Sequence, residues 1–206
     1  MEYCQDIIRT VELTDFHEAK ELFDFSGMII NDQPLCSCLE SLHLRSLTAL
    51  NHIWRGPIRS VQLLYLRDLK IYECPNMRTL FTSTIIAGSL TKLEKIEIGN
   101  CINLETILVM GELDFSEVPF FPALHRINIK GCNKLKSVLP LSVAQELPRL
   151  HSLGIENCPV LQHVFSADEG EHTDYGNLHD IKLPNLRSLK LAKVPSSMLF
   201  TSAILL

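Results

Sequence analysis

Cysteine is the residue type in this sequence whose recurrence could support chemistry. Four of the seven cysteines follow one another at intervals of 27, 31 and 26 residues: Cys74, Cys101, Cys132 and Cys158. Thiolates bind zinc or form disulfides, but zinc sites usually take their cysteines from close C-x2-C pairs. The odd total and the wide, regular spacing favour buried free thiols in a reducing compartment, although distance alone does not exclude a disulfide between neighbouring members of the series.

An acidic segment towards the C-terminal end is a second candidate, because carboxylates and imidazoles bind metal ions. Its spacing does not match an EF-hand loop, and it has no hydrophobic periodicity. Such segments are typical of solvated loops, so we predict no metal ligands there. The residues concerned are Asp168, Glu169, Glu171, His172, Asp174, His179 and Asp180.

Motifs of catalysis and nucleotide binding are absent from the sequence. It contains no G-x-x-x-x-G-K-[ST] or G-x-G-x-x-G phosphate loop, no His-Glu-x-x-His and no G-x-S-x-G. We therefore expect neither enzymatic activity nor a cofactor.

Composition narrows the classes of partner. The 206 residues carry a formal net charge of −5, which argues against a protein that neutralises nucleic-acid phosphates. No apolar run approaches the roughly 18 residues of a membrane-spanning helix. The first residues lack the basic and apolar regions of a signal peptide, and no Asn begins a glycosylation sequon. These features predict a cytoplasmic protein with no membrane partner.

The elements that must position these residues form an internal repeat. Its spacing is apolar-x-x-apolar-x-apolar-x-x-(Cys or apolar)-x-x-apolar, as in Leu93-x-x-Ile96-x-Ile98-x-x-Cys101-x-x-Leu104. Seven copies start near residues 8, 39, 66, 93, 124, 150 and 186. We expect residues 1–206 to form a single domain of about seven repeats that lacks terminal caps.

The spacing of the repeat also predicts the fold. The apolar-x-apolar pair has the period of a strand, and one unit cannot bury its apolar face without stacking on neighbours. The pattern matches the leucine-rich repeat. We predict an α/β leucine-rich-repeat solenoid with a curved parallel β-sheet on the concave face and short helices and loops on the convex face. One such helix is predicted within residues 140–147.

Two stretches, residues 93–108 and 150–165, resemble the C-terminal repeats of plant disease-resistance proteins of the coiled-coil, nucleotide-binding (NB-ARC), leucine-rich-repeat class. The phrases Leu-Pro-Arg-Leu at 147–150 and Leu-Pro-Asn-Leu at 183–186 resemble the L-P-x-L repeat start of that family. No phosphate-loop motif of the family occurs in these residues, and we expect neither its nucleotide-binding domain nor its N-terminal signalling domain in this sequence. The resemblance therefore implies only the sensing and autoinhibitory part of an immune receptor.

Two functions follow as hypotheses. The resemblance implies a protein-recognition module of an intracellular plant immune receptor that acts in pathogen sensing, defence and autoinhibition. Its partner would be a pathogen effector, a guarded host protein or the receptor's own nucleotide-binding domain. The alternative is the substrate-binding repeat domain of an F-box ubiquitin-ligase adaptor, although the I-T-D-x-G-L phrase of those repeats is missing.

Residues that flank the apolar pair of each strand must point to the open face of the sheet. Charged and aromatic side chains gather there, and Tyr and Arg dominate the hot spots of protein interfaces. Over the whole face we count ten Lys or Arg and eight Asp or Glu. The candidate protein-binding residues on the concave face are Arg45, Asp68, Lys70, Tyr72, Lys95, Glu97, Arg126 and Lys130.

Overall fold

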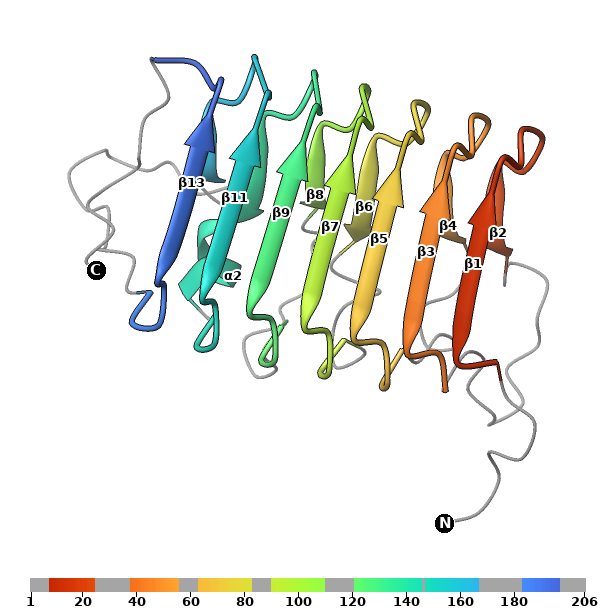
Figure 1. Cartoon of the computed structure of the whole chain (residues 1–206), viewed down its shortest axis with the longest axis horizontal. Helices are drawn as coiled ribbons and strands as arrows, with labels where there is room; N and C mark the ends of the chain where they lie inside the picture. Colours follow the sequence, from red (N-terminus) through yellow and green to blue (C-terminus); the bar gives the residue numbers. More distant parts are fainter. Residues whose placement is uncertain are drawn as a thin grey trace, which may run out of the picture.

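A seven-stranded parallel sheet forms one side of the protein (Figure 1). The computed structural model describes residues 8–24, 38–55, 63–82, 90–109, 121–145, 147–166 and 183–196. Each strand of the sheet begins two residues after one of the repeat starts. In their spatial order the strands are β1 (Thr10–Thr14), β3 (Ser41–Arg45), β5 (Asp68–Tyr72), β7 (Lys95–Gly99), β9 (Arg126–Lys130), β11 (Ser152–Glu156) and β13 (Ser188–Ala192).

Each strand separates an apolar face from a polar one. In β5, Leu69 and Ile71 are fully buried while the three residues that alternate with them are part-exposed. Neighbouring strands pair without a shift between equivalent repeat positions, so Leu69 lies between Leu42 and Ile96. Because a shift of one residue would turn every apolar side chain to solvent, burial of one face specifies this register.

A residue in the left-handed backbone conformation follows every strand of the sheet. The seven residues have φ between 53° and 68°, which turns the chain inward, and each N–H whose acceptor is recorded donates to the last carbonyl of the next strand, as Asn100 does to Lys130 at 2.8 Å. Four of these residues immediately precede the repeated cysteines, whose side chains thereby enter the core. The seven are Asp15, Ser46, Glu73, Asn100, Gly131, Asn157 and Lys193.

Replacing Gly131 with alanine is expected to lower the free energy of unfolding by about 1–2 kcal/mol. Gly131 has φ of 68°, and a Cβ there would collide with Oδ1 of Asn100 on the neighbouring turn. Urea unfolding followed by circular dichroism measures the effect. Asn157→Gly is the matched control, because it places the permissive residue at an equivalent turn and should leave stability unchanged or raised. Equal stability of G131A and the native chain would contradict this account of the turn.

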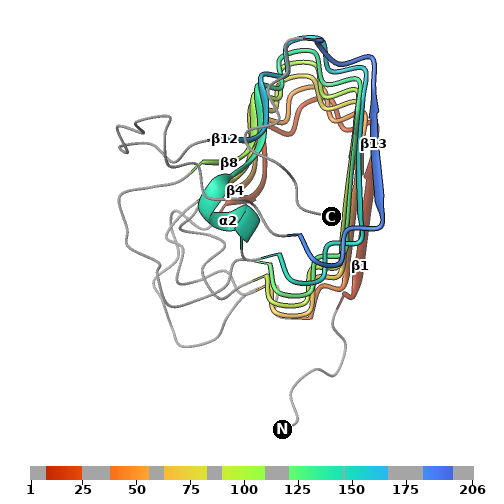
Figure 2. The ribbon, with the colours of Figure 1, turned by 90° about the vertical axis from the view of Figure 1, so that its left-hand side faces the viewer.

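A second layer of short strands faces the large sheet across the interior (Figure 2). Four strands pair in the order β12-β10-β8-β6, and two others pair as β2-β4. The predicted helix within 140–147 is confirmed as α2 (Leu141–Gln145). In the other described repeats this side carries strands where short helices were also expected. They are β2 (Glu21–Asp24), β4 (His52–Arg55), β6 (Thr79–Thr82), β8 (Thr106–Val109), β10 (Ser137–Pro140) and β12 (His163–Ser166).

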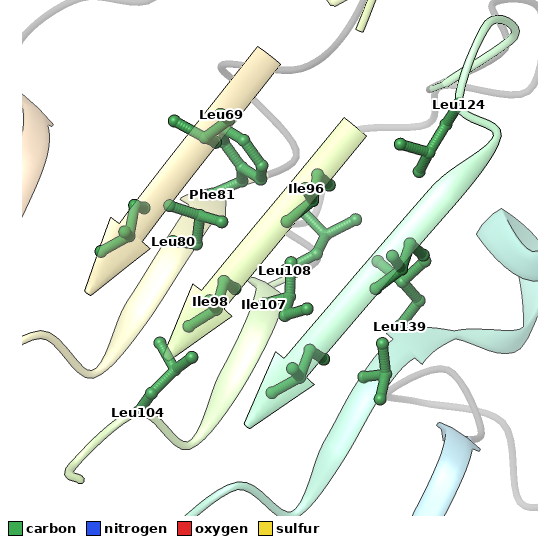
Figure 3. Close-up of a cluster of buried hydrophobic side chains, with 14 of the residues drawn as sticks. Leu69, Leu80, Phe81, Ile96, Ile98, Leu104, Ile107, Leu108, Leu124 and Leu139 are labelled. Atoms are coloured by element: carbon green, nitrogen blue, oxygen red, sulfur yellow. The ribbon is translucent and has the colours of Figure 1, made fainter. Parts of the chain in front are cut away.

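The hydrophobic core fills the space between the two layers. Figure 3 shows Ile96 and Ile98 of β7 directed towards Ile107 and Leu108 of β8. All four are at most 3% exposed. Aromatic side chains also pack between neighbouring repeats, as where Trp54 of β4 stacks on Phe23 of β2 with ring centroids 5.3 Å apart. The core thus forms a continuous row along the solenoid and leaves the far face of the large sheet to polar residues.

Candidate functional site

The eight candidate residues lie on four adjacent strands, β3, β5, β7 and β9, and all point away from the core. They alternate along each strand with buried residues. The register places Arg45 opposite Tyr72, and Lys95 opposite Arg126. The structure therefore brings these side chains together on one continuous face, here called the open face. It consists of the outward residues of the seven strands and the residues immediately before and after each strand.

Asp68 is the centre of a charge cluster on β3 and β5. Its Oδ2 lies 3.0 Å from Nζ of Lys70 and 3.2 Å from Nε2 of His43. Burial raises the pKa of Asp68, but the hydrogen bonds from Lys70 and His43 outweigh that effect and hold it below its ordinary value. Lys70 is also opposite Glu97 in the register, yet its ammonium contacts Asp68 on its own strand.

Tyr72 is held in place by its neighbours on β7. Its hydroxyl donates to Oε2 of Glu97 at 3.1 Å, and its ring lies over Gly99, where a Cβ would collide with the ring carbons. Burial and the hydrogen bond to Glu97 raise the pKa of Tyr72 above its ordinary value. The absence of a side chain at Gly99 therefore lets the aromatic ring lean along the sheet.

A shallow hollow opens on the open face beside Tyr72. It has a volume of about 180 Å³ and is lined by residues of β1, β3 and β5, among them Glu12, Arg45, Lys70 and Tyr72. Arg45 forms an ion pair with Glu73 at 3.2 Å, and Ser46 donates a hydrogen bond to the same carboxylate at 2.9 Å. The walls of the hollow are thus fixed by contacts within the chain, and its size suits one side chain of a partner.

The cysteine series is part of the core. Cys74, Cys101, Cys132 and Cys158 are free and fully buried, which confirms the prediction of buried thiols. Each thiol donates weakly to the carbonyl two residues before it, at 3.4 to 3.7 Å. Among the described cysteines, Cys38 differs because it is disulfide-bonded. The four aligned thiols therefore fill space and bond the turn, without the grouping that a zinc ion requires.

Burial sets the acidity of two of these thiols, and a contact between two thiols sets that of the others. It raises the pKa of Cys132 to about 12 and also raises the pKa of Cys158. Cys74 and Cys101 interact with each other, and this contact lowers the pKa of Cys74 and raises that of Cys101, where burial adds to the rise. Since the thiolate is the reactive form, a raised pKa makes a cysteine a poor nucleophile and metal ligand.

The described residues show neither a metal-binding cluster nor a membrane-spanning helix. They contain no group of three or more His, Cys, Asp or Glu side chains arranged to hold a metal ion. No helix among them has the length and apolar character needed to cross a membrane. The acidic residues 168–180 lie outside the described residues.

Sequence reasoning did not single out the carboxylates that border the strands. Glu73 follows β5 and pairs with Arg45, whereas Glu94 precedes β7 and pairs with Arg67 at 2.6 Å. The sequence did offer a signal for them. Each carboxylate lies one residue outside the five-residue strand of its own repeat, beside the cation of the preceding repeat. These carboxylates neutralise Arg45 and Arg67, which the alternating pattern alone would predict to be unpaired.

Comparison with known proteins gives two matches. Residues 6–102 and 103–159 match the family described as "Plant disease resistance protein RPS2-like, leucine-rich repeats". Over 128 residues the chain is 27% identical to the probable disease resistance protein At4g27220 of Arabidopsis thaliana. That alignment covers 61% of this chain and 13% of the relative, so the chain spans a small part of the length of the protein it matches.

Proposed function

Because the chain belongs to the leucine-rich-repeat family of RPS2-like plant disease resistance proteins, we propose that it is the protein-recognition module of an intracellular plant immune receptor. Its open face binds a pathogen effector, a guarded host protein or the nucleotide-binding domain of the receptor itself. Through these contacts the module senses pathogens and restrains the receptor in the cytoplasm. The leucine-rich repeat is a non-catalytic repeat family. In this proposal the module therefore acts by binding other proteins.

The observation that carries the proposal is the arrangement of the open face. Arg45, Tyr72 and Arg126 project from strands of one in-register sheet, and the first two are anchored by Glu73 and Glu97. Side chains that are already held in place lose less conformational entropy when a partner binds. Tyr and Arg are also the residue types most enriched among interface hot spots. The family match favours this function over that of an F-box adaptor.

A partner protein is first identified by co-purification. Replacing Arg45, Tyr72 and Arg126 together with alanine is expected to lower the affinity for that partner by at least about thirtyfold, because loss of one hot spot costs about 2 kcal/mol or more. Isothermal titration calorimetry of the purified pair measures the change. The control variant replaces Arg78, Tyr65 and Arg149, which are exposed and lie outside the open face. It removes the same residue types and should bind normally.

The outcome that contradicts the proposal is equally concrete. If the triple variant binds the partner as tightly as the native chain and deletion of residues 167–180 abolishes binding, the acidic segment is the recognition site and the open face is not. Thermal melting of each variant shows that a loss of binding is not a loss of folding.

A further inference from the structure

The charges of the open face are distributed unevenly between its two ends. On the strands nearest the N-terminus, each described Lys or Arg of the face lies within ion-pair distance of a carboxylate. These ion pairs neutralise the positive charge of that half, so its cations already have partners within the chain. The pairs are Arg9–Glu40 at 3.3 Å, Arg45–Glu73 at 3.2 Å, Arg67–Glu94 at 2.6 Å and Lys70–Asp68 at 3.0 Å.

Three cations at the beginnings of β7, β9 and β13 are different. Within the part of the chain that the structure describes, Lys95, Arg126 and Arg187 have no carboxylate within 4 Å. Lys95 and Arg126 are direct cross-strand neighbours. Like charges that face each other across a sheet destabilise it, so this pair carries a cost that an incoming anion would remove.

Two histidines connect these cations. The rings of His125 and His151 lie 6.1 Å apart. The N–H of His151 donates to the carbonyl of His125 at 2.9 Å, and the N–H of Arg187 donates to the carbonyl of His151 at 2.8 Å. The three residues are therefore successive neighbours across the sheet. With Lys95 and Arg126 they form a contiguous cluster, called the basic patch: Lys95, His125, Arg126, His151 and Arg187.

The carboxylates beside the basic patch have closer partners outside it. Glu94 lies 2.6 Å from Arg67 and 3.9 Å from His125. Asp68 is opposite Lys95 in the register, but its carboxylate contacts Lys70 at 3.0 Å and His43 at 3.2 Å. Burial lowers the pKa of His125, and Lys95, His151 and Arg126 lower it further against the opposing effect of Glu94. Burial, the largest of these causes, therefore disfavours the protonated form of His125.

We propose that the basic patch docks an acidic segment of the partner protein, whose Asp and Glu carboxylates supply the ion pairs that Lys95, Arg126 and Arg187 lack. This inference rests on the proposed function, because it assumes that the open face binds protein. The patch spans four strands, or roughly 15 Å at about 4.8 Å per strand spacing, which suits a few consecutive acidic residues. A long nucleic-acid polyanion fits less well, since the chain as a whole carries a net charge of −5.

The proposal is tested with a fluorescein-labelled peptide of six glutamates and the full chain, by fluorescence anisotropy at low salt. We expect the hexaglutamate to bind, and a hexaglutamine peptide not to bind. Lys95→Glu with Arg126→Glu should weaken hexaglutamate binding by at least about tenfold. The matched control, Arg78→Glu with Lys134→Glu, makes the same change in net charge at exposed positions outside the open face and should bind within about twofold of the native chain.

Three results would overturn the proposal. One is the absence of hexaglutamate binding to the native chain. Another is equal weakening in both double variants, which would indicate non-specific electrostatics. The third is tighter binding of a single-stranded oligonucleotide of equal charge that is lost in the same variant. If the charge-reversal variant does not fold, Lys95→Gln with Arg126→Gln replaces it. Each result leaves the proposed function intact, because that function is tested by the binding of a partner protein to the Arg45, Tyr72 and Arg126 variant and not by the binding of hexaglutamate.

Discussion

Replacing Phe121 with alanine is expected to lower the free energy of unfolding by about 3–5 kcal/mol, the largest effect of any single substitution considered for this chain. Phe121 is fully buried in the turn before β9, and its ring packs against that of Phe81 with centroids 6.0 Å apart. The substitution removes a large side chain from a site between two repeats and leaves a cavity that the stacked layers cannot close. Urea unfolding monitored by circular dichroism measures the loss.

The control for this prediction is the same substitution at an exposed phenylalanine. Phe16 is 55% exposed, so Phe16→Ala should change stability by no more than about 0.5 kcal/mol. If F121A and F16A unfold at the same urea concentration, the two-layer core between the repeats is not what stabilises the fold.

Stability is expected to fall steeply as the pH rises above about 9, because burial raises the pKa of the Cys132 and Cys158 thiols in the folded chain. Burial raises the pKa of Cys132 from 9.0 to about 12. Below pH 9 both states keep the proton and the stability is unaffected. Between pH 9 and 12 the unfolded chain loses the proton while the folded chain retains it, so each pH unit costs roughly a factor of ten in the unfolding equilibrium. At pH 10.5 Cys132 alone costs about 2 kcal/mol.

The contribution of Cys132 is separated from other titrating groups by comparing pH slopes. Cys132→Ala should show a shallower decline of unfolding free energy between pH 9 and 10.5 than the native chain, whatever its stability at pH 7. Cys158, whose pKa is also raised, offers the same test at the next repeat. Parallel slopes in C132A and the native chain would show that this thiol ionises as readily in the folded state as in the unfolded one.

The strands of the large sheet could be predicted from the sequence because their pattern has one physical solution. An apolar-x-apolar pair such as Leu69 and Ile71 must bury both side chains on one face, and repetition at nearly equal intervals stacks equivalent positions. The open face followed directly, since the residues between the apolar pair, such as Lys70, have no other direction to point. The position of the cysteines after the strand likewise predicted their burial.

The second layer of strands was less accessible to sequence reasoning. In β6 only Leu80 and Phe81 are apolar, and two adjacent apolar residues have too little periodicity to separate strand from helix. β6 becomes a strand because Thr79 and Phe81 pair with Thr106 and Leu108 of the next repeat. Where residues 141–145 follow a proline at the end of β10, the chain forms a helical turn instead. The neighbouring repeat, and not local propensity, therefore selected the element.

The sequence by itself thus determined which residues of this protein face solvent on the sheet and which are lateral neighbours. Only the tertiary structure decided how their charges pair. Lys70 is opposite Glu97 in the register, but its ammonium contacts Asp68, and Glu97 accepts a hydrogen bond from Tyr72. Lys95 and Arg126 remain unpaired in the described structure. The physical reason is that long charged side chains reach several neighbours whose interaction energies differ by less than about 1 kcal/mol, so local geometry makes the choice.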